Sequence, residues 1–379
     1  MKNGFASFIM TIVMILIIVV LGLFGVLIYQ DIMGEDSSQI VENFVSTYNP
    51  ATDNSVQDSK KITTPQVVKD KINQIINSSS GTKEDTNYSN VQINKYFYNQ
   101  LNDYSKTIYK ALESNKENLK TGTARIDLGT SFTSILEKEN GENLLGQYYQ
   151  SAVETYLYDN PDVFYISANK LYLNIETITK RKKKTYNVFI NNGDKPNYFT
   201  DDFNSQSEVE EAIKMVEQTK NQIVTQKTNN VYSDIKLAHD YLINNVDYDT
   251  AVSQNNIYDI YGALVKNKCV CEGYAKAFKY LLDNMNIPCV MVIGKATNSN
   301  GTTENHAWNY VQINQNWYAV DCTWDDPVII GNGKVGNETK YKYFLRGSSY
   351  INRDHISNGQ FTDGGETYQY PALSVTDYR

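Results

Sequence analysis

The chain has 379 residues and a formal net charge of -8, with 43 acidic against 35 basic side chains. An acidic chain of this kind lacks the basic footprint of a nucleic-acid-binding protein, so no nucleic-acid partner is expected. Its four cysteines, which all fall between residues 269 and 322, are too few for a disulfide scaffold.

The first 30 residues predict a membrane anchor. Phe5 to Tyr29 is almost wholly apolar, and about 20 apolar residues are enough to cross a bilayer as a helix. Lys2 precedes this run and acidic residues come after it, so the positive-inside rule places the N-terminus in the cytoplasm. A cleaved signal peptide is the alternative, but its apolar region would be shorter, about 7–15 residues. We expect a single-pass protein of the cell membrane whose main part is extracytoplasmic.

Composition divides the remainder into three parts. Residues 31–90 are rich in Ser, Thr, Asn and Asp, which cannot build a core, and are predicted to form a polar stalk. A short helix is expected within it, from Pro65 to Ile76. Residues 91–228 are predicted to form an α+β N-terminal region, and residues 229–379 the part that carries the candidate chemistry. The last two parts could also share one core.

The N-terminal region is predicted to alternate between helices and strands. Apolar residues recur three and four apart from Phe97 to Leu112, which indicates a helix with one buried face. Further helices are expected over Leu144 to Tyr158 and Ser207 to Thr225, and strands over Val163 to Ile166, Leu171 to Ile178 and Thr185 to Ile190. The basic run at residues 180–184 lies between the last two strands and predicts a solvated hairpin turn. Contact with an anionic cell-wall polymer is the alternative.

A helix is predicted to begin at Cys271 and to end at Asn286, after another helix from Tyr232 to Asn244. A cysteine in the first helical turn lies at the positive end of the helix dipole, which favours the thiolate. Cys269 precedes it in a C-x-C pattern, but no second pair of ligands completes a zinc site. We therefore expect neither a metal nor a cofactor. The other two cysteines, at 289 and 322, are predicted to be buried core residues.

Two strand-like segments, Asn305 to Ile313 and Asn316 to Cys322, are separated by two residues. A two-residue hairpin loop would pair Ile313 with Asn316 and would make Asp321 the diagonal neighbour of His306. Diagonal neighbours lie about 7–8 Å apart, close enough for a ring N–H to reach a carboxylate.

Cys271, His306 and Asp321 are then a nucleophile, its base and the residue that orients the base. His239 and His355 lack such neighbours in the sequence and are predicted to be structural. Asp325 and Asp326 are expected to shape a turn or to line a cleft.

These motifs resemble the transglutaminase-like superfamily of cysteine enzymes, in its bacterial, membrane-anchored branch. The resemblance covers about residues 230–379 and rests on Cys-x-Gly-Tyr-Ala at 271–275, His-Ala-Trp-Asn at 306–309 and Val-Asp-x-Thr-Trp-Asp-Asp-Pro at 320–327. It implies a papain-like α+β core, in which the helix of the nucleophile packs on an antiparallel sheet. It also implies that Cys271 is the nucleophile, His306 the base and Asp321 the orienting residue. Tyr261 and Trp308 are candidates for the oxyanion site or the cleft.

The expected function is that of a cell-surface cysteine enzyme that acts on a peptide or protein through an amide acyl donor. An amine acceptor would give crosslinking, and water would give deamidation or amide hydrolysis. Cleft shape and water exclusion decide between these outcomes, so the triad does not distinguish them. Two alternatives remain open: a cysteine peptidase that acts on cell-wall or surface peptides, and a non-catalytic peptide-binding module on the same fold.

Overall fold

The computed structural model describes residues 59–63, 95–180, 182–228, 230–252, 255–326, 337–358 and 367–379, the first of these ranges by its backbone alone. All of them belong to one compact unit, Gln57–Arg379. The predicted anchor, the predicted helix from Pro65 to Ile76 and most of the predicted stalk lie outside the described residues. Among the described helices, none has the length and apolar character needed to cross a bilayer.

The N-terminal part of this unit contains a four-stranded antiparallel sheet with the order β1-β3-β4-β2. The strands are β1 (Ser59–Thr63), β2 (Ile126–Gly129), β3 (Tyr172–Lys180) and β4 (Lys183–Asn191). The sequence predicted β3 and β4 to within two residues at each end. It did not predict β1, which lies inside the proposed stalk and pairs with β3.

The helices of the N-terminal part include three long ones: α3 (Asp103–Ser114), α6 (Gly141–Asp159) and α7 (Gln206–Val224). The last two lie within three residues of their predicted ends, whereas α3 begins six residues after the predicted start at Phe97. Short ones are α4 (Lys116–Leu119), α5 (Thr133–Leu136) and the 3-10 turns η3 (Tyr98–Gln100), η4 (Pro161–Val163) and η5 (Ala168–Lys170). Helices α3 and α6 pack against each other.

The predicted strand from Val163 to Ile166 was wrong. The chain instead forms the 3-10 turn η4, which ends at Val163, with Pro161 at its first position and the N–H of Val163 donating to the carbonyl of Asn160. Ile166 makes only an isolated β-bridge to Phe199. Proline suits the first turn of a helix because its φ is fixed and it has no N–H to satisfy. The apolar side chains are buried all the same, so the hydrophobic signal was correct and the type of element was not.

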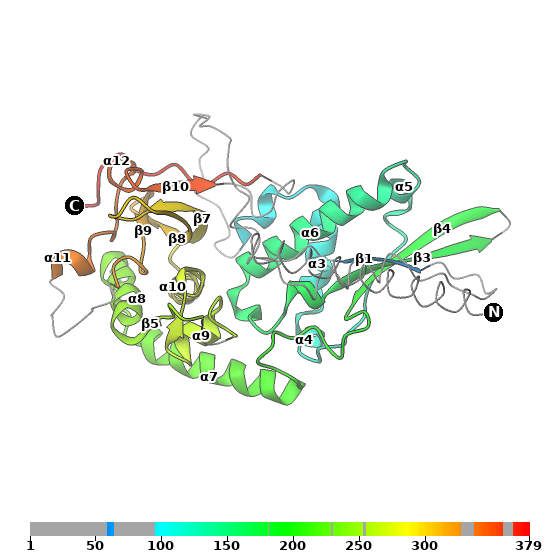
Figure 1. The fold of residues 1–379 in the computed structure, drawn as a ribbon, viewed down its shortest axis with the longest axis horizontal. Coiled ribbons are helices and arrows are strands. Elements are labelled where there is room, and N and C mark those ends of the chain that lie inside the picture. The colour runs from blue at the N-terminus through cyan, green and yellow to red at the C-terminus, as the bar shows by residue number, and fades with distance from the viewer. Residues whose placement is uncertain are drawn as a thin grey trace, which may run out of the picture. The chain divides into compact units, whose positions relative to one another are not determined.

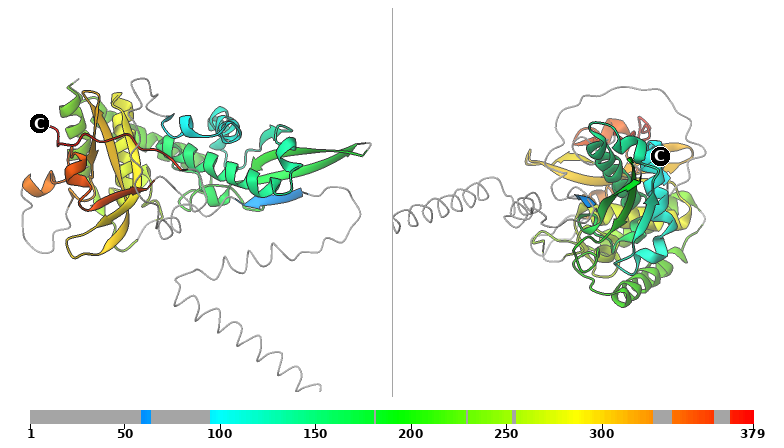
Figure 2. Two further views of the ribbon diagram at one scale, coloured as in Figure 1. Left: turned by 90° about the horizontal axis from the view of Figure 1, so that it is seen from above. Right: turned by 90° about the vertical axis from the view of Figure 1, so that its right-hand side faces the viewer.

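The hairpin turn at the basic run is confirmed. Lys180 pairs with Lys183 across the turn, and Lys182 adopts a positive φ of 70°. Lys180, Lys182, Lys183 and Lys184 are all exposed. In Figure 2 the far end of the β3–β4 hairpin extends beyond the neighbouring helices.

The C-terminal part is built on a second antiparallel sheet, with the order β10-β7-β8-β9. Its strands are β7 (Cys289–Thr297), β8 (Thr303–Ile313), β9 (Asn316–Val320) and β10 (His355–Asn358). Helix α10 (Cys271–Met285) packs on β7 and β8 and also contacts α8 (Val231–Asn245) and α9 (Ile260–Leu264), as can be seen in Figure 1. The smaller elements are β5 (Asp247–Tyr248), β6 (Lys268–Cys269), α11 (Asn337–Lys340) and α12 (Ser348–Ile351).

The predicted mixture of helix and sheet, with the cysteine helix on an antiparallel sheet, is therefore present. Buried residues from both parts of the chain form one continuous core. The hydroxyls of Thr155 and Tyr368 lie 2.6 Å apart, and Tyr280 donates to Glu217 at 2.7 Å. A domain boundary at residue 228 stays a prediction.

Candidate active site

Cys271 is the first residue of α10, at the position the sequence predicted. The helix ends where expected, because Asn286 adopts a left-handed conformation with φ of 62°. All four cysteines are free thiols. Cys271 is 8% exposed, against 0% for Cys269, 1% for Cys289 and 3% for Cys322, so Cys271 is the most accessible of the four.

Gly273 explains how Cys271 is held at the helix start. A Cβ on this glycine would lie 2.5 Å from the Cβ of Cys269 and 2.8 Å from the carbonyl oxygen of Ile257. Such contacts are far inside van der Waals distance, so only glycine lets α10 begin directly after β6. This close approach fixes the backbone on both sides of Cys271.

The predicted hairpin that carries His306 is confirmed in its register. Ile313 pairs with Asn316, and the same register continues to the pair of Asn309 and Val320. The loop residues Asn314 and Gln315 both have positive φ, as the two-residue hairpin turn that matches strand twist requires.

The second strand of this hairpin ends at Val320, two residues before its predicted end. Asp321 causes the early end, because its Oδ1 accepts the backbone N–H groups of Thr323 and Trp324 at 3.0 and 3.2 Å. An aspartate that bonds the backbone two and three residues ahead favours a turn over a strand. Asp321 therefore stands at the start of a turn, with its other oxygen directed elsewhere.

That other oxygen contacts His306. Nε2 of His306 lies 2.7 Å from Oδ2 of Asp321, and both side chains are buried. Burial alone would lower the pKa of His306, but the charge of Asp321 and the hydrogen bonds of Asp321 and Cys271 outweigh it and raise the pKa to about 10. Because Nε2 is engaged by Asp321, Nδ1 is the nitrogen left for Cys271.

The pKa of Asp321 is shifted in the opposite direction, as expected for its partner in an ion pair. Burial alone would raise the pKa of its carboxyl, but the charge of His306 and hydrogen bonds from His306 and His355 hold that pKa well below its usual range. An ionised carboxylate beside a protonated imidazole is the arrangement that orients a catalytic histidine and stabilises its charge.

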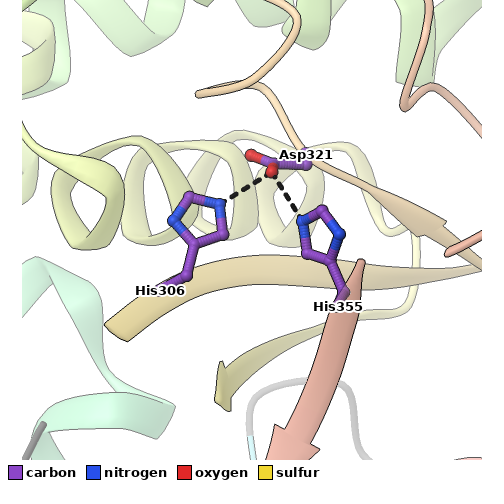
Figure 3. A group of neighbouring side chains, drawn as sticks. All are labelled: His306, Asp321 and His355. Carbon is purple, nitrogen blue, oxygen red and sulfur yellow. Dashed lines mark hydrogen bonds and ion pairs between the residues drawn. The ribbon is translucent and has the colours of Figure 1, made fainter. Parts of the chain in front are cut away.

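His355 is the residue that the sequence analysis missed. Its Nε2 lies 3.0 Å from the same Oδ2 of Asp321, and its Nδ1 lies 2.7 Å from Oδ1 of Asp354. Figure 3 shows the rings of His306, on β8, and His355, on β10, directed at one carboxylate. The neighbours of His355 in the sequence did not indicate this shared carboxylate, and its predicted structural role stays a prediction. The only signals were that the chain has just three histidines and that an aspartate precedes this one.

These three side chains could also be considered as metal ligands. In the part of the chain that the structure describes, one ligand atom each from His306, Asp321 and His355 lie within 4.8 Å of one another. Both nitrogens are already at hydrogen-bond distance from the carboxylate oxygen, and all three residues are buried. His306 and His355 are thus hydrogen-bonded partners of the Asp321 carboxylate.

Tyr261, on α9, is placed in an aromatic cluster. Its ring stacks on Phe164 with centroids 5.7 Å apart and meets Phe203 edge-on at 5.4 Å. These are the contacts of a packing tyrosine. An oxyanion role for Tyr261 stays a prediction.

Trp308 lies beside the histidines. Its ring is stacked at 6.0 Å from that of His306 and edge-on at 5.0 Å from that of His355. Trp324 contacts the same two rings, at 5.4 and 4.6 Å. Both tryptophans therefore restrict how far the imidazoles can turn.

Tyr248 was not predicted from the sequence. Burial and, next, the charge of Cys271 raise the pKa of its hydroxyl, which places Tyr248 near the nucleophile. It is half-buried.

A second buried histidine–carboxylate cluster surrounds His239 on α8. Its ring nitrogens lie 3.1 Å from Asp240 and 3.1 Å from Asp325. Asp325 also accepts the backbone N–H of Tyr343 at 2.7 Å. Asp326 instead accepts a hydrogen bond from the hydroxyl of Tyr274. This cluster anchors the turn that begins at Asp321, in keeping with the structural roles predicted for His239 and Asp325.

Comparison with known proteins gives one family and several distant structures. The sequence model of the transglutaminase-like superfamily matches residues 217–322. Kyphoscoliosis peptidase from Mus musculus is 26% identical over 144 residues, which are 35% of this chain and 21% of that protein. The chain thus spans about a fifth of the length of this relative.

Among solved structures, a crystal structure of a TGase has 13% identity and a TM-score of 0.28, over 45% of this chain and 48% of that one. A proposed cysteine protease from Cytophaga hutchinsonii has 16% identity and a TM-score of 0.25, over 40% of this chain and 64% of that one.

Proposed function

We propose, from the premise that residues 217–322 belong to the transglutaminase-like superfamily, that this chain is a cysteine enzyme of amide acyl transfer. Its substrate would be a peptide or protein. The observation that carries the proposal is the buried pair of His306 and Asp321, whose Nε2 and Oδ2 lie 2.7 Å apart, together with a hydrogen bond between Cys271 and His306 that helps to raise the pKa of this imidazole. That order of nucleophile, base and orienting carboxylate is the one that activates a thiol.

In the proposed reaction the Cys271 thiolate attacks the carbonyl carbon of the amide. A C–S bond forms, and the C–N bond breaks as His306 donates its proton to the leaving amine. An amine or water then attacks the thioester, His306 takes up the proton of this second nucleophile, and the Cys271 thiolate leaves. Asp321 holds the imidazole in one orientation and stabilises its positive charge throughout.

The negative oxygen of the intermediate needs donors in front of Cys271. Backbone N–H groups in the first turn of a helix lack intrahelical partners, so the start of α10 is suited to this role. Trp308 would then form a wall beside His306, because its ring stacks on that imidazole. Tyr248 is a further candidate for a residue that lines the site beside Cys271.

A cysteine peptidase is the second candidate function. It uses the same first step and differs only in that water resolves the thioester. The relative from mouse is itself named a peptidase. A non-catalytic peptide-binding module is the third candidate, but such a module has no need for a buried imidazole between a thiol and a carboxylate.

The acceptor can be identified directly. The chain is incubated with glutamine-containing peptides, with and without a labelled primary amine, and the products are analysed by mass spectrometry. We expect products that depend on Cys271: an amine adduct for a crosslinking enzyme, a deamidated peptide or a cleaved peptide for the hydrolytic reactions. Identical products from Cys271→Ala, or no product with any peptide, would favour the binding module.

We also propose that the enzyme is held at the cell surface by the apolar run from Phe5 to Tyr29. About 20 apolar residues suffice for a membrane-spanning helix, and the charge asymmetry around the run favours export of the chain on its C-terminal side. Protease added to intact cells should digest the chain beyond residue 31. Full protection, or a mature N-terminus near Gln30, would contradict the anchor.

A further inference from the structure

One carboxylate oxygen serves two histidines in this site. Oδ2 of Asp321 lies 2.7 Å from Nε2 of His306 and 3.0 Å from Nε2 of His355, as Figure 3 shows. Oδ1 of Asp321 accepts the N–H groups of Thr323 and Trp324. The carboxylate therefore has four partners, and turning it about its Cβ–Cγ bond would break bonds on both sides.

His355 is itself held firmly. Nδ1 lies 2.7 Å from Oδ1 of Asp354, whose Oδ2 accepts the hydroxyl of Tyr343 at 2.7 Å. His355 is 2% exposed. A chain of hydrogen bonds, buried except at the half-buried Asp354, thus runs from Tyr343 through Asp354, His355 and Asp321 to His306.

The sheet explains how residue 355 reaches this place. His355 pairs with Ala296 on one side of β7, and His306 pairs with Gly294 on the other. Directly paired residues carry their side chains on the same face of a sheet, so both imidazoles lie on one face. A Cβ on Gly294 would lie 2.1 Å from the carbonyl oxygen of Ile356, so this glycine allows β10 to approach β7 closely.

We propose that His355 is a positioning residue for the acyl transfer: it fixes Asp321 so that His306 stays aligned with Cys271. The proposal rests on the function proposed above. His355 lies beyond residue 322, where the family match ends. Because it is buried behind Asp321, it acts through that carboxylate and not on the substrate.

Two variants of His355 separate its two hydrogen bonds. In His355→Gln the amide nitrogen can occupy the place of Nε2 and still donate to Asp321. In His355→Asn it takes the place of Nδ1 and reaches Asp354 alone. Losing one hydrogen bond to a charged group should lower kcat of His355→Asn roughly tenfold, with KM unchanged. His355→Gln should stay close to the wild-type kcat.

His239 provides the matched control. It is also buried, both of its ring nitrogens face carboxylates, and Asp325 lies in the same turn as Asp321. His239→Asn and His239→Gln should leave kcat near the wild-type value. An equal loss of kcat in His239→Asn and His355→Asn, or in both His355 variants, would show that any change at these sites disturbs the turn that begins at Asp321. That result would overturn the proposal.

The alkylation rate of Cys271 by iodoacetamide gives a readout that needs no substrate. His355→Asn should slow this alkylation and His355→Gln should not. His355→Phe, which can pack against Trp308 and Trp324, provides a second variant without the hydrogen bond to Asp321. Circular dichroism checks the fold of each variant. If this pattern holds while wild type acts on no peptide, the proposed function fails and the positioning role stands. If alkylation is unchanged in His355→Asn and His355→Phe, the positioning role fails whatever the activity.

Discussion

Replacing Cys271 by alanine should abolish the covalent acyl-enzyme, whereas Cys269→Ala should leave it near the wild-type level. Cys271 contacts His306 and is the most accessible of the four thiols. Cys269 lies two residues away, is fully buried, and its burial raises the pKa of its thiol far above the usual value. Because a thiol reacts through its thiolate, Cys269 cannot replace the lost nucleophile.

Mass spectrometry of the intact chain after brief reaction with a peptide substrate measures the acyl-enzyme. Limiting iodoacetamide near pH 7 provides a second measurement and should label Cys271 before Cys269, Cys289 or Cys322. An acyl-enzyme that survives in Cys271→Ala and disappears in Cys269→Ala would reverse the assignment. Equal labelling of Cys269 and Cys271 would contradict the role of His306 in activating the thiol.

The same labelling should depend on pH through His306. The pKa of this imidazole is raised to about 10, so its positive charge persists through neutral pH. We therefore expect wild type to react faster than His306→Ala at pH 7, and this advantage to be lost as the pH rises through 10, where the imidazole loses its proton. An advantage already lost below pH 7 would show that the imidazole is not held in its charged form.

Much of this site could be predicted because its parts are local in sequence. Cys271 stands at the start of a helical pattern, and Asn314 and Gln315 fix the register that brings His306 near Asp321. His355 could not be found in this way. It lies 34 residues after Asp321 on an edge strand of four residues, too short for a periodic signal, and its place depends on pairing with β7.

The errors at Val163–Ile166 and at the end of β9 have a shared cause. In both places the apolar pattern correctly indicated burial, but a nearby turn-forming residue determined the backbone conformation. Pro161 begins a 3-10 turn in the first case, and the Asp321 carboxylate binds the backbone ahead of it in the second. Turn-forming residues overrode the apolar pattern in both places.

Asp321→Asn should lower turnover and also destabilise the fold. Asp321 accepts four hydrogen bonds, two at each oxygen. An amide has donors on one side, so asparagine would face either two backbone N–H groups or two imidazole nitrogens with an N–H of its own. Leaving buried donors unsatisfied costs about 1–3 kcal/mol of unfolding free energy.

The expected loss of turnover for Asp321→Asn is large but below the roughly 10⁴-fold seen for the equivalent change in a serine triad. A thiolate needs less help from the third residue than a hydroxyl does, because cysteine ionises far more readily. Asp325→Asn is the matched control: it too is a buried aspartate that binds a histidine and a backbone N–H. Denaturant unfolding should show comparable destabilisation in both variants, while peptide turnover should fall steeply only in Asp321→Asn. Equal turnover in the two variants would mean that Asp321 serves the fold alone, and that His306 needs no carboxylate to act on Cys271.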